Sequence, residues 1–208
     1  MQFETERQLI CKFVKNMYDR WLTNAAGGNI SMRVGEDRYV MTATRLSSHK
    51  LWDITPDDVL VVDGELNVLE GDGVPTREIN MHMAIYQKDA KTRAVVHAHA
   101  RNLMVFAGRG LDMPVQSEAL GFLGEQIPCL AYRTAASPEL AALVGQWAGE
   151  YVRDLEDRAH DAEDNYAYGA LLNGHGVIVG GESLFVAYEM LERMDTNAYI
   201  VTQGAGLR

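Results

Sequence analysis

Hydrophobic and polar positions follow helical and strand spacings in turn along the first third of the chain. Residues 5–22 carry apolar side chains three or four positions apart, which predicts an amphipathic helix with one face on a core. Residues 29–34 and 38–42 alternate between apolar and polar positions and are separated by a glycine-containing turn, which predicts a β-hairpin. The apolar run 59–62 follows turn-forming residues and predicts a buried strand.

The middle of the chain continues this interleaving. Residues 78–87 have helical spacing, the short apolar run 94–99 predicts a strand, and a helix is expected over 102–107. Residues 127–131 predict an edge strand, because their proline cannot donate a hydrogen bond to a neighbouring strand.

The last third opens on a strong helix start. Ser137 is a preferred N-cap residue and Pro138 suits the first helical position, so we expect a helix to about Asp154. Residues 171–179 predict two strand pieces around a glycine-flanked histidine, and a long final helix is expected over 180–199. Because no linker, repeat or low-complexity tract intervenes, residues 1–208 are expected to form one α/β domain.

Composition and charge narrow the functional classes. Of the 208 residues, 47% are hydrophobic and 23% charged, which excludes a disordered, coiled-coil or collagen-like chain. The net charge of −10 and the absence of a lysine- or arginine-rich run argue against nucleic-acid and membrane-surface partners. No apolar run is long enough to span a membrane and no signal region follows the polar N-terminus, so a soluble, cytoplasmic protein is expected. Cys11 and Cys129 are too few for a disulfide framework or a thiolate metal site.

The candidate chemistry begins with a pair of histidines on a predicted strand. His97 and His99 are two positions apart, so both side chains project from the same face and can reach one metal ion. Three protein ligands with one open position are typical of a catalytic zinc-like site. His175 lies between two glycines in a tight turn at the end of another predicted strand, where a ligand would have room beside it.

Each of these signals has an ordinary explanation when taken alone. A His-x-His pair also occurs by chance, and Glu78 is typical of a solvated carboxylate in the first turn of a helix. His82 lies four positions after Glu78, on the same helical face, and is interpreted as a hydrogen-bonded core histidine. His49 and His160 are interpreted as solvated. The glycine-rich turn before Asn29 matches neither the dinucleotide fingerprint nor the P-loop, which disfavours a nucleotide site.

In combination, however, the motifs resemble the class II aldolase/adducin family, and within it the L-fuculose-1-phosphate aldolase type. The matching segments occur in order and cover most of the chain, from about Met17 to Ala198. They are Gly28-Asn29-Ile30-Ser31, Glu78 with His82, Val95-Val96-His97-Ala98-His99-Ala100, Ile127-Pro128-Cys129 and Leu172-Asn173-Gly174-His175-Gly176.

The resemblance implies a fold and a metal centre. It implies a three-layer α/β/α domain around a central, mainly antiparallel sheet, assembled as a homotetramer with active sites at subunit interfaces. His97, His99 and His175 fall on the family's metal-binding histidines, and Glu78 falls on the carboxylate that binds the resting metal or acts as acid/base. The implied cofactor is Zn²⁺ or another divalent ion such as Mn²⁺ or Co²⁺.

The resemblance also implies a phosphate site, with departures from the family pattern. Gly28, Asn29, Thr44 and Thr76 fall at or close to phosphate-binding positions. Arg45 and Arg77 stand where the family usually has small residues, and the guanidinium group suits phosphate and a substrate carboxylate equally. For Arg77, an orientation toward solvent is an equal alternative.

A second departure concerns the family's acid/base tyrosine, which a neighbouring subunit supplies. Its position lies at or near Glu118, and related methylthioribulose-phosphate dehydratases carry a glutamate in this region. Glu118 is therefore a second candidate acid/base, with an ordinary loop carboxylate as the alternative. The tyrosine-bearing C-terminal lid of the fuculose type is expected to be absent or replaced by another segment that covers the site.

The sequence thus predicts a divalent-metal-dependent lyase. The expected reaction is reversible aldol cleavage of a small ketose phosphate to dihydroxyacetone phosphate and an aldehyde through a metal-stabilised enediolate, with Glu78 moving a proton. Two alternatives use the same metal site, for dehydration or for decarboxylation of a sugar-acid phosphate. A third is a non-catalytic adducin-like binding domain, which would have no need for the histidines and Glu78.

Overall fold

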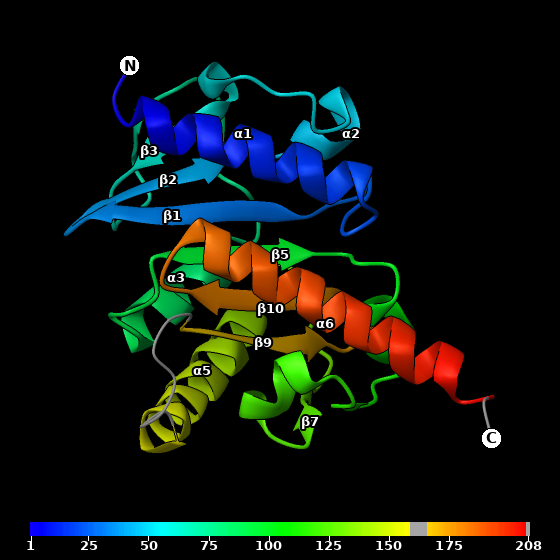
Figure 1. Ribbon diagram of the computed structural model, residues 1–208. Coiled ribbons are helices and arrows are strands. Elements are labelled where there is room, and N and C mark those ends of the chain that lie inside the picture. The colour runs from blue at the N-terminus through cyan, green and yellow to red at the C-terminus, as the bar shows by residue number, and fades with distance from the viewer. Residues whose placement is uncertain (159–165, 207–208) are drawn as a thin grey trace.

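One central sheet of eight strands organises the computed structural model (Figure 1), which describes residues 1–158 and 166–206. Every neighbouring pair in this sheet is antiparallel except β8 and β9, which are parallel. The predicted mainly antiparallel sheet is therefore confirmed. In spatial order the strands are β4 (Val68–Glu70), β3 (Val59–Val62), β2 (Arg38–Thr42), β1 (Asn29–Gly35), β5 (Ala94–Ala98), β10 (Gly176–Gly181), β9 (Ala167–Leu172) and β8 (Cys129–Leu130).

Helices cover both faces of this sheet, which gives the three predicted layers (Figure 1). Helices α1 (Glu4–Asp19) and α6 (Leu184–Gly204) share one face, where the ring centroids of Phe13 and Phe185 lie 5.0 Å apart. Helices α3 (Ile79–Lys88) and α5 (Pro138–Arg158) pack together on the other face. On β9, Tyr168 faces Trp147 of α5, with ring centroids 5.7 Å apart, whereas the next residue, Gly169, faces α6.

The remaining elements are short and were not predicted, apart from the helix α4 and the segment that contains β7. A five-residue helix or a two-residue strand contains too few positions to show a period. They are α2 (Leu46–Lys50), η1 (Pro56–Asp58), α4 (Leu103–Ala107), β6 (Met113–Pro114), η2 (Glu118–Leu123) and β7 (Gln126–Ile127), the last paired with β6.

The expected single edge strand over 127–131 is wrong, because the segment divides at Pro128. Ile127 pairs with Met113 in a separate two-stranded ribbon, whereas Cys129 pairs with Leu171 at the edge of the main sheet. Proline has no N–H group to continue a ladder, and this explains the division.

The final helix begins later than expected, at Leu184. Gly180 and Gly181 belong to β10, where they pair with both β5 and β9. The Ser183 side chain then caps the helix by accepting a hydrogen bond of 3.2 Å from the Val186 N–H.

Other boundaries also shift. The first helix ends at Asp19, although Leu22 beyond it is still buried. The predicted cap of α5 is confirmed, since Ser137 Oγ accepts a hydrogen bond of 3.1 Å from the Leu140 N–H, and this helix runs past Asp154 to Arg158. His160 lies outside the described residues.

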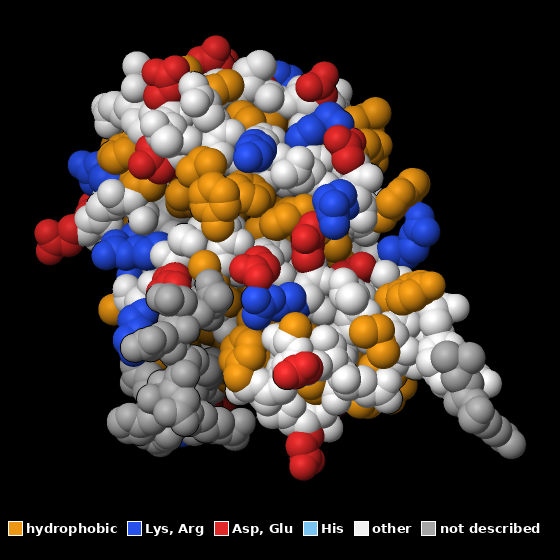
Figure 2. Space-filling model, viewed as in Figure 1, with side chains coloured by type: hydrophobic (Ala, Val, Ile, Leu, Met, Phe, Trp, Pro, Cys, Tyr) orange, Lys and Arg blue, Asp and Glu red, His pale blue; other side chains and the backbone are white. Residues whose placement is uncertain are grey.

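On the face shown in Figure 2, acidic and basic side chains are interspersed with apolar ones, so the acidic excess is not gathered into one patch there. Among the described helices, each is too short or too polar to cross a lipid bilayer.

His82 is a hydrogen-bonded core histidine, as predicted. Its side chain is fully buried, and Nδ1 lies 2.7 Å from Ser31 Oγ, which in turn lies 2.9 Å from the Tyr86 hydroxyl. Burial lowers the pKa of His82 to about 3, so the ring is neutral at physiological pH.

This buried histidine should make the protein less stable in mild acid. The unfolded chain binds a proton near pH 6.5, whereas the folded chain does so only near a pKa of about 3. The stabilisation is fully present above pH 6.5 and is lost as the pH falls, by about 2 kcal/mol between pH 7 and pH 5. His82→Gln should be less stable than the wild type at pH 7. Between pH 7 and pH 5, however, its free energy of unfolding should fall by about 2 kcal/mol less than that of the wild type, as measured by urea unfolding of metal-free protein. The exposed His49 supplies the control variant His49→Gln, and equal losses in His82→Gln and wild type would contradict the prediction.

Candidate active site

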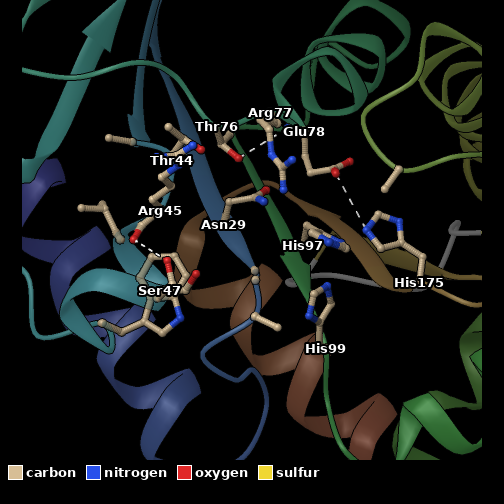
Figure 3. Close-up of a pocket in the computed structure, with 18 residues that line it drawn as sticks. Asn29, Thr44, Arg45, Ser47, Thr76, Arg77, Glu78, His97, His99 and His175 are labelled. Atoms are coloured by element: carbon tan, nitrogen blue, oxygen red, sulfur yellow. Dashed lines mark hydrogen bonds and ion pairs between the residues drawn. The ribbon is translucent and has the colours of Figure 1, made fainter.

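Three histidine side chains converge where β5 and β10 meet (Figure 3). His97 lies on β5, His99 directly follows that strand, and His175 lies in the turn between β9 and β10. One ring nitrogen from each lies within 4.8 Å of the others, and the ring centroids of His97 and His175 are 4.7 Å apart. The fold therefore brings together the predicted pair and the predicted third ligand, which we call the histidine cluster.

The histidine cluster has the chemistry of a divalent metal site. Nδ1 of His97 is 2.9 Å from the Val177 carbonyl oxygen, which leaves its Nε2 for a ligand. Among the described residues, His99 Nε2 and His175 Nδ1 are buried without a hydrogen-bond partner. A bound cation would satisfy such orphaned nitrogens, so the residues fit a metal ion held by three imidazoles with one position open.

Burial also keeps the histidine cluster uncharged. Desolvation lowers the pKa of His99 to about 4 and the pKa of His97 well below its usual range, and repulsion from neighbouring imidazoles adds to both shifts. The pKa of His175 is lowered by burial as well, although the Glu78 carboxylate opposes that shift. Neutral imidazole is the form that binds a metal, so the cluster is ready for one at neutral pH.

Two glycines make room for the His99 ring. A Cβ atom at Gly27 would collide with His99 Cε1, and one at Gly176 would collide with the Ala98 carbonyl oxygen and lie 2.9 Å from His99 Cδ2. The glycine after His175 therefore makes room for the neighbouring strand and for the His99 ring.

Glu78 faces the histidine cluster from the start of α3. Its Oε1 lies 3.8 Å from His175 Nε2, and its Oε2 accepts a hydrogen bond of 3.3 Å from the Ala136 N–H. One carboxylate oxygen thus faces His175, and the other is held by the loop before α5. The role of Glu78 as ligand or acid/base stays a prediction.

A cavity of about 300 Å³ extends from the histidine cluster to an opposite side that we call the polar wall (Figure 3). Two loops meet there, because Thr44 N–H donates a hydrogen bond of 2.9 Å to the Val74 carbonyl and Ala43 bridges to Pro75. All six predicted phosphate-site residues line this cavity, with Thr44, Arg45 and Thr76 on the polar wall and Asn29 beside His97 across the β1–β5 pairing, although their contacts with substrate stay predictions. The six residues are Gly28, Asn29, Thr44, Arg45, Thr76 and Arg77.

The cavity also contains residues that sequence reasoning missed. Ser47 and Ser48 on α2 lie next to Arg45 on the polar wall, and Ala135 lies in the loop before α5. Ser48 Oγ donates a hydrogen bond of 3.2 Å to the Arg45 carbonyl. The one sequence signal for Ser47 and Ser48 was that they closely follow Thr44 and Arg45, because α2 is too short to show a helical period.

Glu118 is exposed at the start of η2 and is outside the cavity of its own chain. The buried amide of Asn197 fixes this segment, because its Oδ1 accepts hydrogen bonds from the N–H groups of Gln116 (2.8 Å) and Ser117 (2.9 Å). A catalytic role for Glu118 therefore requires the cavity of another subunit, as the sequence analysis expected.

Comparisons with known proteins agree with this geometry. Residues 8–202 match the family model of the class II aldolase and adducin N-terminal domain. The chain is 28% identical over 203 residues to a 5-deoxy-D-ribulose 1-phosphate aldolase of Bacillus thuringiensis, covering 98% of this chain and 87% of the relative. It is 26% identical over 211 residues to a 3-oxo-tetronate 4-phosphate decarboxylase of Haemophilus influenzae, covering 98% and 90%.

A solved structure is similar over the same length. An L-fuculose 1-phosphate aldolase structure superposes with a TM-score of 0.77 at 25% identity, covering 99% of this chain and 90% of that chain. The expected fold and the expectation of an aldolase-type lyase are confirmed. With the family match extending over nearly its whole length, the chain belongs to the class II aldolase and adducin family.

Proposed function

We propose that this protein is a divalent-metal-dependent lyase that reversibly cleaves a small ketose phosphate to dihydroxyacetone phosphate and an aldehyde. The observation that carries the proposal is the convergence of the histidine cluster and Glu78 on one side of a cavity whose other side is the polar wall. A four-carbon to five-carbon phosphate ester is short enough for such a cavity and has its charge at one end.

The polar wall supplies groups that suit a phosphate. Hydroxyl groups of Thr44, Ser47 and Thr76 can donate hydrogen bonds, and the Arg45 guanidinium adds positive charge. Because the phosphate would be held at this end, the carbon chain would extend toward the histidine cluster.

In the cleavage direction, two protons must move as the C3–C4 bond breaks. A base takes the proton of the C4 hydroxyl group, C4 becomes the aldehyde carbon, and the bond electrons pass toward the carbonyl at C2. Glu78 is placed to deliver a proton to C3, because its carboxylate faces the histidine cluster. Glu118 of a neighbouring subunit is our candidate for the base. A divalent ion such as Zn²⁺, Mn²⁺ or Co²⁺ would supply Lewis acidity for the developing negative charge.

Product analysis tests the proposal. Metal-loaded protein is incubated with a panel of ketose 1-phosphates, and the products are separated and identified. Dihydroxyacetone phosphate with an equal amount of aldehyde supports aldol cleavage, and the reverse reaction should rebuild the substrate. A diketone formed by water loss, or release of carbon dioxide, would overturn aldol cleavage in favour of dehydration or decarboxylation.

Decarboxylation of a sugar-acid phosphate is the second candidate, and the two arginines that line the cavity favour it. One relative along the whole chain is named a 3-oxo-tetronate 4-phosphate decarboxylase. Dehydration is supported by Glu118 alone. A non-catalytic binding domain is disfavoured, because the fold assembles three histidines next to a carboxylate.

We also propose a homotetramer in which each site takes Glu118 from a neighbouring subunit. Glu118→Gln should lower kcat about 10²-fold or more with metal content unchanged. Glu118→Gln and His97→Ala subunits, each of low activity alone, can then be mixed. In randomly assembled hybrids up to about a quarter of the sites should regain activity, because these sites combine an intact His97 with an intact Glu118 from the neighbouring subunit. Mixed subunits that stay inactive although they exchange, as shown by mass spectrometry of the intact assembly, would contradict a shared site. The exposed Glu139, at the start of α5, gives the control variant Glu139→Gln.

A further inference from the structure

Two guanidinium groups occupy different places along the cavity. Arg45 begins α2 beside Thr44 and Ser47, at the end of the polar wall away from the histidine cluster. In Figure 3 the Arg77 guanidinium extends into the cavity between Asn29 and the histidine cluster. The two arginines are therefore placed to bind two separate groups of one ligand.

Neither guanidinium group is neutralised by the protein. In the described part of the chain, no hydrogen bond or ion pair joins the side chain of Arg45 or Arg77 to another residue. The nearest acid in sequence to Arg77 is Glu78, but its two oxygens face His175 and the Ala136 N–H. Arg77 thus keeps its charge and its donor groups for a ligand.

The charged side chains that line the cavity also favour a ligand with two anionic groups. Apart from the histidines, the charged side chains in the cavity wall are Arg45, Arg77 and Glu78. A phosphate bound at Arg45 leaves the charge of Arg77, nearer the histidine cluster (Figure 3), uncompensated. A second anionic group on the ligand would balance it.

We infer that Arg77 binds a substrate carboxylate, so that the ketose phosphate of the proposed reaction is a phosphorylated keto sugar acid. This inference rests on the proposed lyase and specifies what its cavity selects. Arg45 and the hydroxyl groups of the polar wall hold the phosphate, and Arg77 pairs with the carboxylate near the histidine cluster. A bidentate guanidinium–carboxylate pair is strong and planar, which suits discrimination between a carboxylate and a hydroxymethyl group.

The test uses two unreactive probes that differ at one group. 3-Phosphoglycerate and glycerol 3-phosphate share a three-carbon phosphate ester, and one carries a carboxylate where the other carries a hydroxymethyl group. Calorimetric titration of metal-free protein measures binding without turnover and without a metal ion that could bind the carboxylate. We expect the wild type to bind 3-phosphoglycerate about tenfold or more tightly than glycerol 3-phosphate.

Three variants test whether Arg77 is the residue that causes tighter binding of 3-phosphoglycerate. Arg77→Ser should reduce the affinity ratio to near one while glycerol 3-phosphate still binds. Arg45→Gly, a change that the positive φ of 64° at this position accommodates, should weaken both probes by a similar factor. Arg93→Ser removes the same charge from an exposed residue before β5, at the opposite end of that strand from His97, and should leave the ratio unchanged.

Two results would overturn the inference. One is a ratio near one in the wild type, and the other is a ratio that Arg77→Ser leaves as high as in the wild type. Either result would leave the proposed aldol cleavage standing, because the products formed by metal-loaded protein decide that proposal. Conversely, absence of lyase products would not alter the binding ratio.

Discussion

His97→Ala should lose its bound metal and lower turnover by about 10³-fold or more. His97 lies at the centre of the histidine cluster, with its ring 4.7 Å from His175 and 5.0 Å from His99. Without it two imidazoles remain, too few to hold a divalent ion in a catalytic site. Elemental analysis of metal-treated, dialysed protein should find about one equivalent in the wild type and almost none in the variant.

The fold should survive this substitution. The variant loses one hydrogen bond to the Val177 carbonyl and leaves a small void, which together cost about 2–4 kcal/mol. Circular dichroism should therefore match the wild type, and His49→Ala, on the exposed face of α2, serves as the matched control. If His97→Ala fails to fold, the partly exposed His175 offers the second variant, His175→Ala. A folded variant with full metal content and full activity would show that the proposed metal site is wrong.

Glu78→Gln should lower kcat by about 10²–10⁴-fold while metal stays bound. The amide is close in size to the carboxylate, and its oxygen can keep the hydrogen bond from the Ala136 N–H, so the loop before α5 should hold its place. What the variant loses is a group that can carry a proton beside the histidine cluster. Steady-state kinetics with metal analysis of the same sample measures both effects.

The outcome also separates two roles for Glu78. If metal content falls together with kcat, Glu78 acts as a metal ligand in addition to the histidines. If metal content holds and kcat falls, Glu78 acts through proton transfer. Unchanged kcat and unchanged metal content would contradict both roles.

The sequence predicted the elements that frame the site better than the connections between them. His97 and His99 could be placed on one face because a strand fixes the direction of alternate side chains. Their approach to His175, by contrast, depends on the antiparallel pairing of β5 with β10. This pairing brings together residues far apart in sequence, such as His97 and Val177, which are 80 positions apart. No local pattern encodes such a pairing, so the third ligand was identified by resemblance.

The polar wall shows the same limit. Thr44 lies in the loop after β2, and Thr76 lies in the loop before α3. One hydrogen bond and one β-bridge join these two loops, and such contacts leave no trace in hydrophobic periodicity. Ser47 escaped prediction because it lies on a helix of five residues. The proposed subunit interface left no mark on one chain, because Glu118 is exposed in its own fold.

The contact between Gly27 and His99 restricts how this protein can diverge. Because a single added methyl group at position 27 would meet the imidazole, the turn that leads into the polar wall and the proposed metal ligand His99 occupy one shared space. A lineage that reshapes this turn to accept a bulkier anion must first move it away from His99 or give up that ligand. We therefore expect substrate range and metal retention to change together at this position, whereas Arg45 and Arg77, with no side-chain hydrogen bond or ion pair in the described chain, can be replaced without displacing His99.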